Sequence, residues 1–304
     1  MKRVLSLLLC AVPLVVPADN PKAESPSATE ASKASQSLRA KPLHERLTPE
    51  ESLALMEPRT FVGADGATLP YRIHVPAGLA PGETIPLVLF LHGSGSRGDD
   101  NKKPVRHAIV RALLEYLRET GTKAFVLAPH CPKEARWANF WGTGGNAAFA
   151  VRAEPTPQMA LVLALLDQTV ASYPIDRSHL YVVGFSMGAH GTWEITLRRP
   201  GFFAAAIPVA GRGPAEEAAR YRNQPLWVFH GADDNVVPVS RSRDMVAALR
   251  ADPGHRAELR YTELPGVKHE GWRPFDGPEA FDWLFAQRRS DSAAERDSPP
   301  SIAP

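Results

Sequence analysis

The turn Gly184-Phe185-Ser186-Met187-Gly188 constrains the fold of this chain more than any other segment. It follows the apolar run Tyr181-Val182-Val183, which favours a buried strand, and it precedes residues of helical period. A strand that enters a helix through Gly-x-Ser-x-Gly passes through a sharp turn with the serine at its tip. The two glycines leave space where a Cβ would contact the neighbouring strand and helix. The layout therefore predicts Ser186 as a nucleophile at the amino end of a helix.

Short, almost wholly apolar segments indicate the centre of a parallel sheet, and they alternate with segments of helical period. Such alternation predicts an α/β fold, with a mostly parallel twisted sheet and helices on both faces. The expected parallel strands are 87–91, 124–128, 180–185, 204–209, 226–230 and 258–264, after antiparallel strands at 59–62 and 69–75. The expected helices are 48–56, 108–119, 158–172, 187–198, 240–250 and 278–287. In such a sheet, functional side chains are expected at the carboxyl ends of the strands.

The first residues have the composition of a targeting segment. Lys2 and Arg3 precede a short apolar run, and small residues before position 19 fit a cleavage site, so residues 1–18 predict a secretory signal peptide. The apolar run is too short to span a bilayer comfortably, so no stable membrane insertion is expected after its removal. The mature protein is expected to be secreted or periplasmic. A lipid anchor at Cys10 stays open as an alternative, although Leu9 stands where a small residue is wanted.

Two further segments differ from the body of the chain in composition. Residues 19–45 and 290–304 are rich in small, polar and charged residues and poor in large apolar side chains. Such segments bury too little surface to offset the entropy lost on ordering, which predicts a flexible linker and a disordered tail. The folded catalytic domain is therefore expected over residues 46–289.

Charge and cysteine content narrow the classes of partner. The 304 residues include 35 Lys and Arg and 33 Asp and Glu, and loss of Lys2 and Arg3 with the signal peptide leaves 33 of each sign. Without a basic excess, binding to nucleic acid or to an anionic membrane is not expected. Cys131 is the one cysteine that remains after cleavage, so no internal disulfide is expected and it is interpreted as a small buried residue. The histidines are scattered, which predicts no metal site and no cofactor.

A serine nucleophile requires a base, and the base requires an acid that orients it. Asp233 and Asp234 stand together in the loop after the predicted strand 226–230. We favour Asp234, because the turn is expected to point its side chain back over the sheet before Val236 and Val237 become buried.

The base is expected after the last predicted strand. His269 follows strand 258–264 in a loop bounded by glycines, whereas its rival His255 precedes that strand and is expected at the opposite edge. Ser186, Asp234 and His269 then occur in the order nucleophile, acid, base.

A glycine-rich segment, His92 to Gly98, follows the predicted strand 87–91. Its glycines let the backbone curl, so that the Ser94 amide can point at a developing oxyanion beside the Met187 amide. A phosphate-binding loop is the competing interpretation. It is disfavoured because the segment lacks the Walker pattern and continues into Asp99-Asp100, which would repel phosphate.

Four segments together resemble secreted bacterial α/β-hydrolases: Leu91 to Asn101, Ala128 to Pro132, Gly184 to Trp193 and His230 to Asp234. They are most similar to the polyhydroxybutyrate-depolymerase and feruloyl-esterase-like group, also described as predicted peptidases or carboxylesterases, over residues 60–287. The resemblance implies the α/β-hydrolase fold, a triad of Ser186, Asp234 and His269, and an oxyanion hole formed by the Ser94 and Met187 amides. One departure is Ala189, where the family often has glycine.

Aromatic residues after the second parallel strand suggest where a substrate could lie. Trp137 and Trp141 stand in a long loop at the predicted catalytic edge, and Trp272 closely follows His269. We expect these three to form a wall on which a sugar or an aromatic acyl group stacks, with burial of the loop aromatics in the domain as the alternative. Arg212 also follows a strand end and is interpreted as a surface residue, with a role in binding a substrate carboxylate left open.

The sequence thus predicts a serine hydrolase that cleaves carboxylic esters of small molecules or esters linked to polysaccharides. A serine peptidase acting on small peptides is the first alternative. A non-catalytic binding protein on the same scaffold is the second, and the complete set of Ser, Asp, His and the glycine-rich turn disfavours it.

Overall fold

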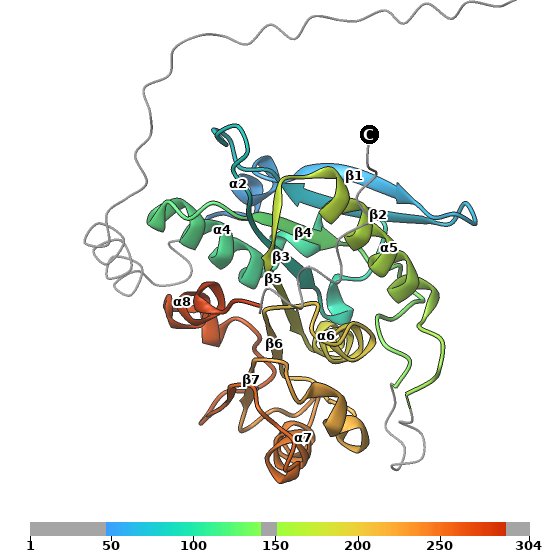
Figure 1. Ribbon diagram of the computed structural model, residues 1–304, viewed down its shortest axis with the longest axis vertical. Coiled ribbons are helices and arrows are strands. Elements are labelled where there is room, and N and C mark those ends of the chain that lie inside the picture. The colour runs from blue at the N-terminus through green and yellow to red at the C-terminus, as the bar shows by residue number, and fades with distance from the viewer. Residues whose placement is uncertain (1–46, 141–150, 290–304) are drawn as a thin grey trace, which may run out of the picture.

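The computed structural model describes residues 47–140 and 151–289, so the predicted signal peptide, linker and C-terminal tail lie outside it. An eight-stranded sheet runs through the described part of the chain (Figure 1). Its strands are β1 (Glu57–Val62), β2 (Thr68–His74), β3 (Ile85–Leu91), β4 (Phe125–Pro129), β5 (Ile175–Phe185), β6 (Ala205–Val209), β7 (Leu226–Gly231) and β8 (Leu259–Leu264). Its helices are α2 (Pro49–Ala54), α3 (Lys103–Arg106), α4 (Ala108–Thr120), α5 (Pro157–Ser172), α6 (Met187–Arg198), α7 (Ser240–Ala251) and α8 (Glu279–Ala286).

The strands are ordered β1-β2-β4-β3-β5-β6-β7-β8 across the sheet. Strands β3 to β8 are mutually parallel, whereas β1 pairs with β2, and β2 with β4, in antiparallel register. The predicted fold class is therefore confirmed. Strand β5 begins at Ile175, earlier than its apolar run, because it pairs there with Ile85 across a shift in register. The residues between Ile175 and Leu180 are polar, so the apolar pattern of the sequence did not predict this part of the strand.

Helices cover both faces of the sheet: α4 and α8 lie on one side, and α5 and α6 on the other (Figure 1). The side chains of β3 alternate between the two resulting cores, as the period of a strand requires. Leu89 joins the cluster that contains Trp193 of α6, and Phe90 joins the cluster that contains Phe281 of α8. Because each face is covered, the central strands are apolar throughout rather than alternating.

The polar residues that the sequence singled out gather at one edge of this sheet. The parallel strands β3, β5, β7 and β8 each end shortly before one of these residues, which are His92, Ser186, Asp234 and His269 in that order. Since parallel strands share the edge at which they end, the topology brings these loops together. No helix within the described residues combines the length and the apolar character needed to cross a membrane.

Candidate active site

The turn between β5 and α6 places Ser186 in a backbone conformation that non-glycine residues rarely adopt. Its φ is 56° and its ψ is −117°, and the side chain is almost fully buried. The Ser186 amide donates to the Val209 carbonyl at 2.9 Å, which ties the turn to the end of β6. Strain of this kind is held only where the surroundings fix it, and it is found mostly at functional sites.

Glycines on both sides of Ser186 make this turn possible. A Cβ on Gly184 would collide with the Gly188 carbonyl, and a Cβ on Gly188 would collide with the Leu91 carbonyl of β3. The first turn of α6 therefore packs directly on the backbone at the end of β3. This close approach brings the amino end of α6 beside the loop that contains Ser94.

The structure brings Ser186, His269 and Asp234 together, as the sequence predicted. His269 Nε2 lies 2.9 Å from Ser186 Oγ, and His269 Nδ1 lies 2.7 Å from Asp234 Oδ2. A carboxylate accepts hydrogen bonds, so Nδ1 carries the proton and Nε2 is left to accept from the serine hydroxyl. The arrangement can therefore move a proton from Ser186 to His269. His255 lies in the turn before β8, at the other end of that strand.

The loop that contains His269 is held against the loop that contains Asp234. Gly231 ends β7, and a Cβ there would collide with the Val267 and Lys268 carbonyls that cross over it. The Asp233 amide donates to the Val267 carbonyl at 3.0 Å, which links the two loops directly. These contacts set the separation between the acid and the base.

Asp234 is oriented by its own loop. Its Oδ1 accepts the Val236 and Val237 amides at 2.8 Å each, while Oδ2 faces His269. The expectation that Val236 becomes buried is wrong, because its side chain is 64% exposed. The aspartate turns inward because its carboxylate accepts these amides, not because apolar side chains follow it. Asp233 is exposed to solvent.

Burial alone would raise the pKa of the Asp234 carboxyl, but hydrogen bonds to the carboxylate reverse that effect. The donors are His230, His269 and the Val237 and Val236 amides, and together they hold the pKa well below its ordinary value. His230 is fully buried at the end of β7, with Nε2 2.8 Å from the Val237 carbonyl and 3.3 Å from Asp234 Oδ2. Asp234 therefore stays ionised and can stabilise a positive charge on His269.

The two predicted oxyanion donors stand at the amino ends of helical turns. Ser94 opens the 3₁₀ turn η2 (Ser94–Ser96) that follows β3, and Met187 is the first residue of α6. Amides at such positions have no carbonyl partner within their own helix, so they are available to an anion. Gly93, which precedes Ser94, packs against the ring of Phe185 at the end of β5. Their role toward an oxyanion stays a prediction.

Trp137 does not form a substrate wall, and that prediction is wrong. Its side chain is fully buried, its Nε1 donates to the His92 carbonyl at 3.0 Å, and its ring packs on Gly191 of α6. The indole instead fills the space between the end of β3 and the helix that follows Ser186. Cys131 is buried as expected, and burial raises the pKa of its thiol to about 12.

The other two predicted wall residues have different outcomes. Trp141 lies outside the described residues. Trp272 is half-buried immediately before the 3₁₀ turn η5 (Arg273–Phe275), close in sequence to His269. Its contact with a substrate stays a prediction.

Arg212 is not the surface residue that the sequence suggested. It is only 7% exposed, and burial lowers the pKa of its guanidinium. It lines a cavity of about 130 Å³ together with Arg241, Glu216 and Asp244. The cavity therefore contains two residues of each charge, and it favours neither an anion nor a cation.

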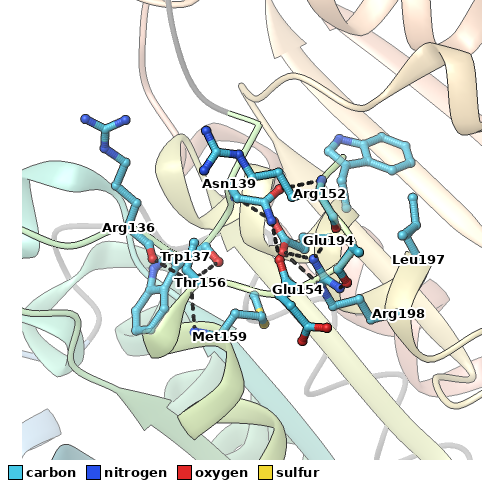
Figure 2. A network of polar contacts seen from close by, with 12 residues as sticks. Arg136, Trp137, Asn139, Arg152, Glu154, Thr156, Met159, Glu194, Leu197 and Arg198 are labelled. Carbon is cyan, nitrogen blue, oxygen red and sulfur yellow. Dashed lines mark hydrogen bonds and ion pairs between the residues drawn. The ribbon is translucent and has the colours of Figure 1, made fainter. Parts of the chain in front are cut away.

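Sequence reasoning also missed a buried ion pair in α6, at the centre of the network in Figure 2. Glu194 is fully buried and accepts the Asn139 amide at 2.8 Å and Arg198 Nε at 2.9 Å. Arg198 in turn donates to the Ala153 and Arg152 carbonyls. Burial raises the pKa of Glu194 despite these donors. The pair attaches the chain before residue 141 and the chain after residue 150 to α6, the helix that follows Ser186.

The fold and this arrangement of serine, histidine and aspartate define an α/β-hydrolase. The chain belongs to the Phospholipase/Carboxylesterase family, whose model matches residues 81–274. Among the residues that the structure describes, no group of three or more His, Cys, Asp and Glu side chains could hold a metal ion.

Three of the known proteins similar to this chain are described as esterases. The solved structure of a thermostable esterase is 35% identical, with a TM-score of 0.69, and the match covers 78% of this chain and 64% of that one. NocK of Nocardia uniformis subsp. tsuyamanensis, assigned as an esterase, is 26% identical over 61% of this chain. A bifunctional acetylxylan esterase/xylanase of Neocallimastix patriciarum is 25% identical over 76% of this chain. The chain spans 51% and 32% of the lengths of these last two relatives.

Proposed function

We propose that this protein is a serine esterase that hydrolyses carboxylic esters through an acyl-enzyme intermediate. The observation that carries the proposal is the chain of two hydrogen bonds from Ser186 Oγ through His269 to Asp234. Membership of a carboxylesterase family and similarity to esterases support the same reaction.

In the proposed reaction, Ser186 Oγ attacks the ester carbonyl carbon while its proton moves to His269 Nε2. The carbonyl π electrons move onto oxygen, and the resulting tetrahedral oxyanion collapses with cleavage of the bond to the alcohol oxygen. His269 gives its proton to that departing oxygen. Water then attacks the acyl carbonyl while His269 Nε2 takes its proton. The second oxyanion collapses with cleavage of the bond to Ser186 Oγ, which recovers the proton from His269 as the acid leaves.

Asp234 and two backbone amides stabilise the charges that form along this path. The buried Asp234 carboxylate fixes the Nδ1-protonated tautomer of His269 and stabilises the imidazolium. The Ser94 and Met187 amides donate to the oxyanion, and a single donor of this kind is typically worth about 3 kcal/mol in the transition state.

The substrate class is part of the proposal. We infer that the protein acts on esters of small molecules or on esters linked to polysaccharides, since one relative is named an acetylxylan esterase.

We also propose that the protein is exported, on the strength of the basic and apolar segment in residues 1–18. Determination of the amino-terminal residue of the secreted product tests export, and a product that retains Met1 in the cytoplasm contradicts it.

Hydrolysis of p-nitrophenyl acetate by the wild type and by Ser186→Ala tests the proposed reaction. We expect the wild type to turn over the ester and the variant to lose activity by a factor of roughly 10⁴ or more, with unchanged thermal stability. A panel of acetyl, feruloyl and longer acyl esters, with aminoacyl anilides as peptide surrogates, then defines the preferred acyl group. Full activity in the variant, or faster cleavage of the anilides than of the esters, contradicts the proposal.

A further inference from the structure

Each predicted oxyanion donor shares a peptide group with a carbonyl that a buried histidine contacts. The Ser94 amide belongs to the same peptide as the Gly93 carbonyl, and His92 Nδ1 lies 2.8 Å from that oxygen. The Met187 amide belongs to the same peptide as the Ser186 carbonyl. His190 Nδ1 lies 2.8 Å from that second oxygen.

The protonation of both rings follows from their partners. A carbonyl oxygen only accepts, so Nδ1 of His92 and of His190 must carry the proton. His92 Nε2 must be the acceptor for the Cys131 amide at 3.0 Å, which fixes the neutral form of this ring from both sides. Burial lowers the pKa of His92 to about 3 and that of His190 to about 4. Both rings are therefore neutral donors at physiological pH.

A hydrogen bond to one side of a peptide fixes the direction of the other side. The peptide group is planar and trans, so its C=O and N–H bonds point in nearly opposite directions. A donor that holds the carbonyl oxygen therefore sets where the amide hydrogen points. Hydrogen bonds in series also polarise one another, which makes the amide a better donor.

We propose that His92 and His190 are positioning residues, each aiming one oxyanion donor by holding the carbonyl of the same peptide. This inference rests on the proposed esterase function, because the two amides matter only if an oxyanion forms at Ser186. Neither ring needs to touch the substrate. Each acts through the backbone, His92 from its place immediately after β3 and His190 from its place on α6.

His92 is expected to matter more than His190. The Gly93 carbonyl also accepts the Ser96 amide at 3.1 Å, but that contact belongs to a three-residue 3₁₀ turn. The Ser186 carbonyl is already held by the Ala189 amide at 2.9 Å, within the twelve-residue helix α6. Without the His92 ring, the Gly93 carbonyl keeps only the Ser96 amide of a short turn. The Ser186 carbonyl, without the His190 ring, still accepts an amide within a long helix.

Leucine and asparagine variants at each position separate the hydrogen bond from the packing. The two side chains have nearly the same shape, but only asparagine can place an N–H donor close to the position of Nδ1. His74→Leu is the matched control, because His74 Nδ1 also contacts a carbonyl, that of Leu55, at 2.9 Å and away from the site. Active sites are titrated with a fluorophosphonate, so that kcat refers only to folded, reactive enzyme.

We expect His92→Leu to lower kcat for p-nitrophenyl acetate by about tenfold per titrated site, with KM nearly unchanged, since the donors act on the transition state. His190→Leu should lower kcat by roughly threefold, and each asparagine variant should recover most of the loss. Inhibition by phenylboronic acid, whose serine adduct occupies the oxyanion hole, should weaken by the same factor as kcat. His74→Leu should match the wild type.

A kcat per titrated site that equals the wild-type value in both leucine variants overturns the proposal. So does a defect confined to melting temperature or to the titratable fraction, since that would mean that the rings only support the fold. If His92→Leu does not fold, His190→Leu and the two asparagine variants still decide the question. A wild type that neither hydrolyses the ester nor reacts with the fluorophosphonate overturns the proposed function first, and this inference with it.

Discussion

The candidate site has two halves, one formed by side chains and the other by backbone amides. After β5, β7 and β8, the proposed chemistry belongs to the side chains of Ser186, His269 and Asp234, which meet over two hydrogen bonds of 2.9 and 2.7 Å. On the side of β3, the proposed chemistry belongs to backbone amides, and side chains such as His92 serve to hold that backbone. Residue type therefore identifies the first half from sequence, whereas the second half depends on contacts between distant loops.

The largest effect is expected from breaking the side-chain half. Asp234→Asn should lower kcat by roughly 10³ to 10⁴, because an amide favours the wrong tautomer of His269 and lacks the charge that stabilises its imidazolium. Asp233→Asn is the matched control, since Asp233 is exposed in the same loop. Steady-state kinetics of the two variants check this, and equal losses in both would remove Asp234 from the triad.

The next largest effect is expected where the two halves meet. Gly188→Ala should lower kcat by about 100-fold or more and reduce stability by several kcal/mol, because its Cβ would collide with the Leu91 carbonyl and force the turn away from β3. Ala189→Gly is its control, with an expected cost near 1 kcal/mol in helix stability. Kinetics and urea unfolding of both proteins provide the measurement, and a fully active Gly188→Ala would mean that this close contact is not needed.

Substitutions of Trp137 and Trp272 are expected to affect different properties, the first stability and the second substrate binding. Trp137→Ala should cost about 3–5 kcal/mol in the free energy of unfolding, as expected for a fully buried aromatic side chain. Trp272→Ala should instead change KM for bulky esters by a few-fold with little effect on stability, if the half-buried Trp272 contacts substrate. Denaturant unfolding alongside KM for acetyl and feruloyl esters distinguishes them. A stable Trp137→Ala with an altered KM would reverse the assignment.

The smallest effect concerns the dependence of stability on pH. An unfolded histidine takes up a proton near pH 6.5, whereas folded His190 stays neutral until about pH 4. The unfolded state therefore binds more protons in this window, so stability falls as the pH drops from 6.5 toward 4, by about 1.4 kcal/mol per pH unit for each such histidine. Urea midpoints of the wild type and His190→Asn at pH 7, 5.5 and 4.5 check this. Identical slopes would show that His190 is not held neutral.

The features that could be predicted from the sequence are those that local patterns along the chain determine. Apolar runs located the central strands, and a chemically distinctive side chain after each strand located Ser186, Asp234 and His269. The strand order was not predictable in this way, because β4 lies between β2 and β3 through pairings that depend on tertiary contacts. The burial of Trp137 could only be left as an alternative for the same reason, since its partners Gly191 and His92 are distant in the chain.

The position of several buried histidines at strand ends was visible in the sequence, but it did not reveal what these histidines do. His92, His130 and His230 each stand at or immediately after the end of an apolar strand. That position places a histidine at the catalytic edge, but it does not reveal whether the ring contacts substrate or backbone. His130, for example, accepts the Asn101 amide and donates to the Ser96 carbonyl, so it serves the loop rather than the reaction. Only the three-dimensional contacts distinguish the two roles.

Covalent labelling is the most direct test of Ser186 as the nucleophile of an esterase. The wild type is incubated with a fluorophosphonate, digested and analysed by mass spectrometry to locate the adduct. We expect a single adduct on Ser186, formed at a rate that falls sharply in His269→Ala and is zero in Ser186→Ala. An adduct on another residue, or no adduct in an enzyme that hydrolyses p-nitrophenyl acetate, would contradict it.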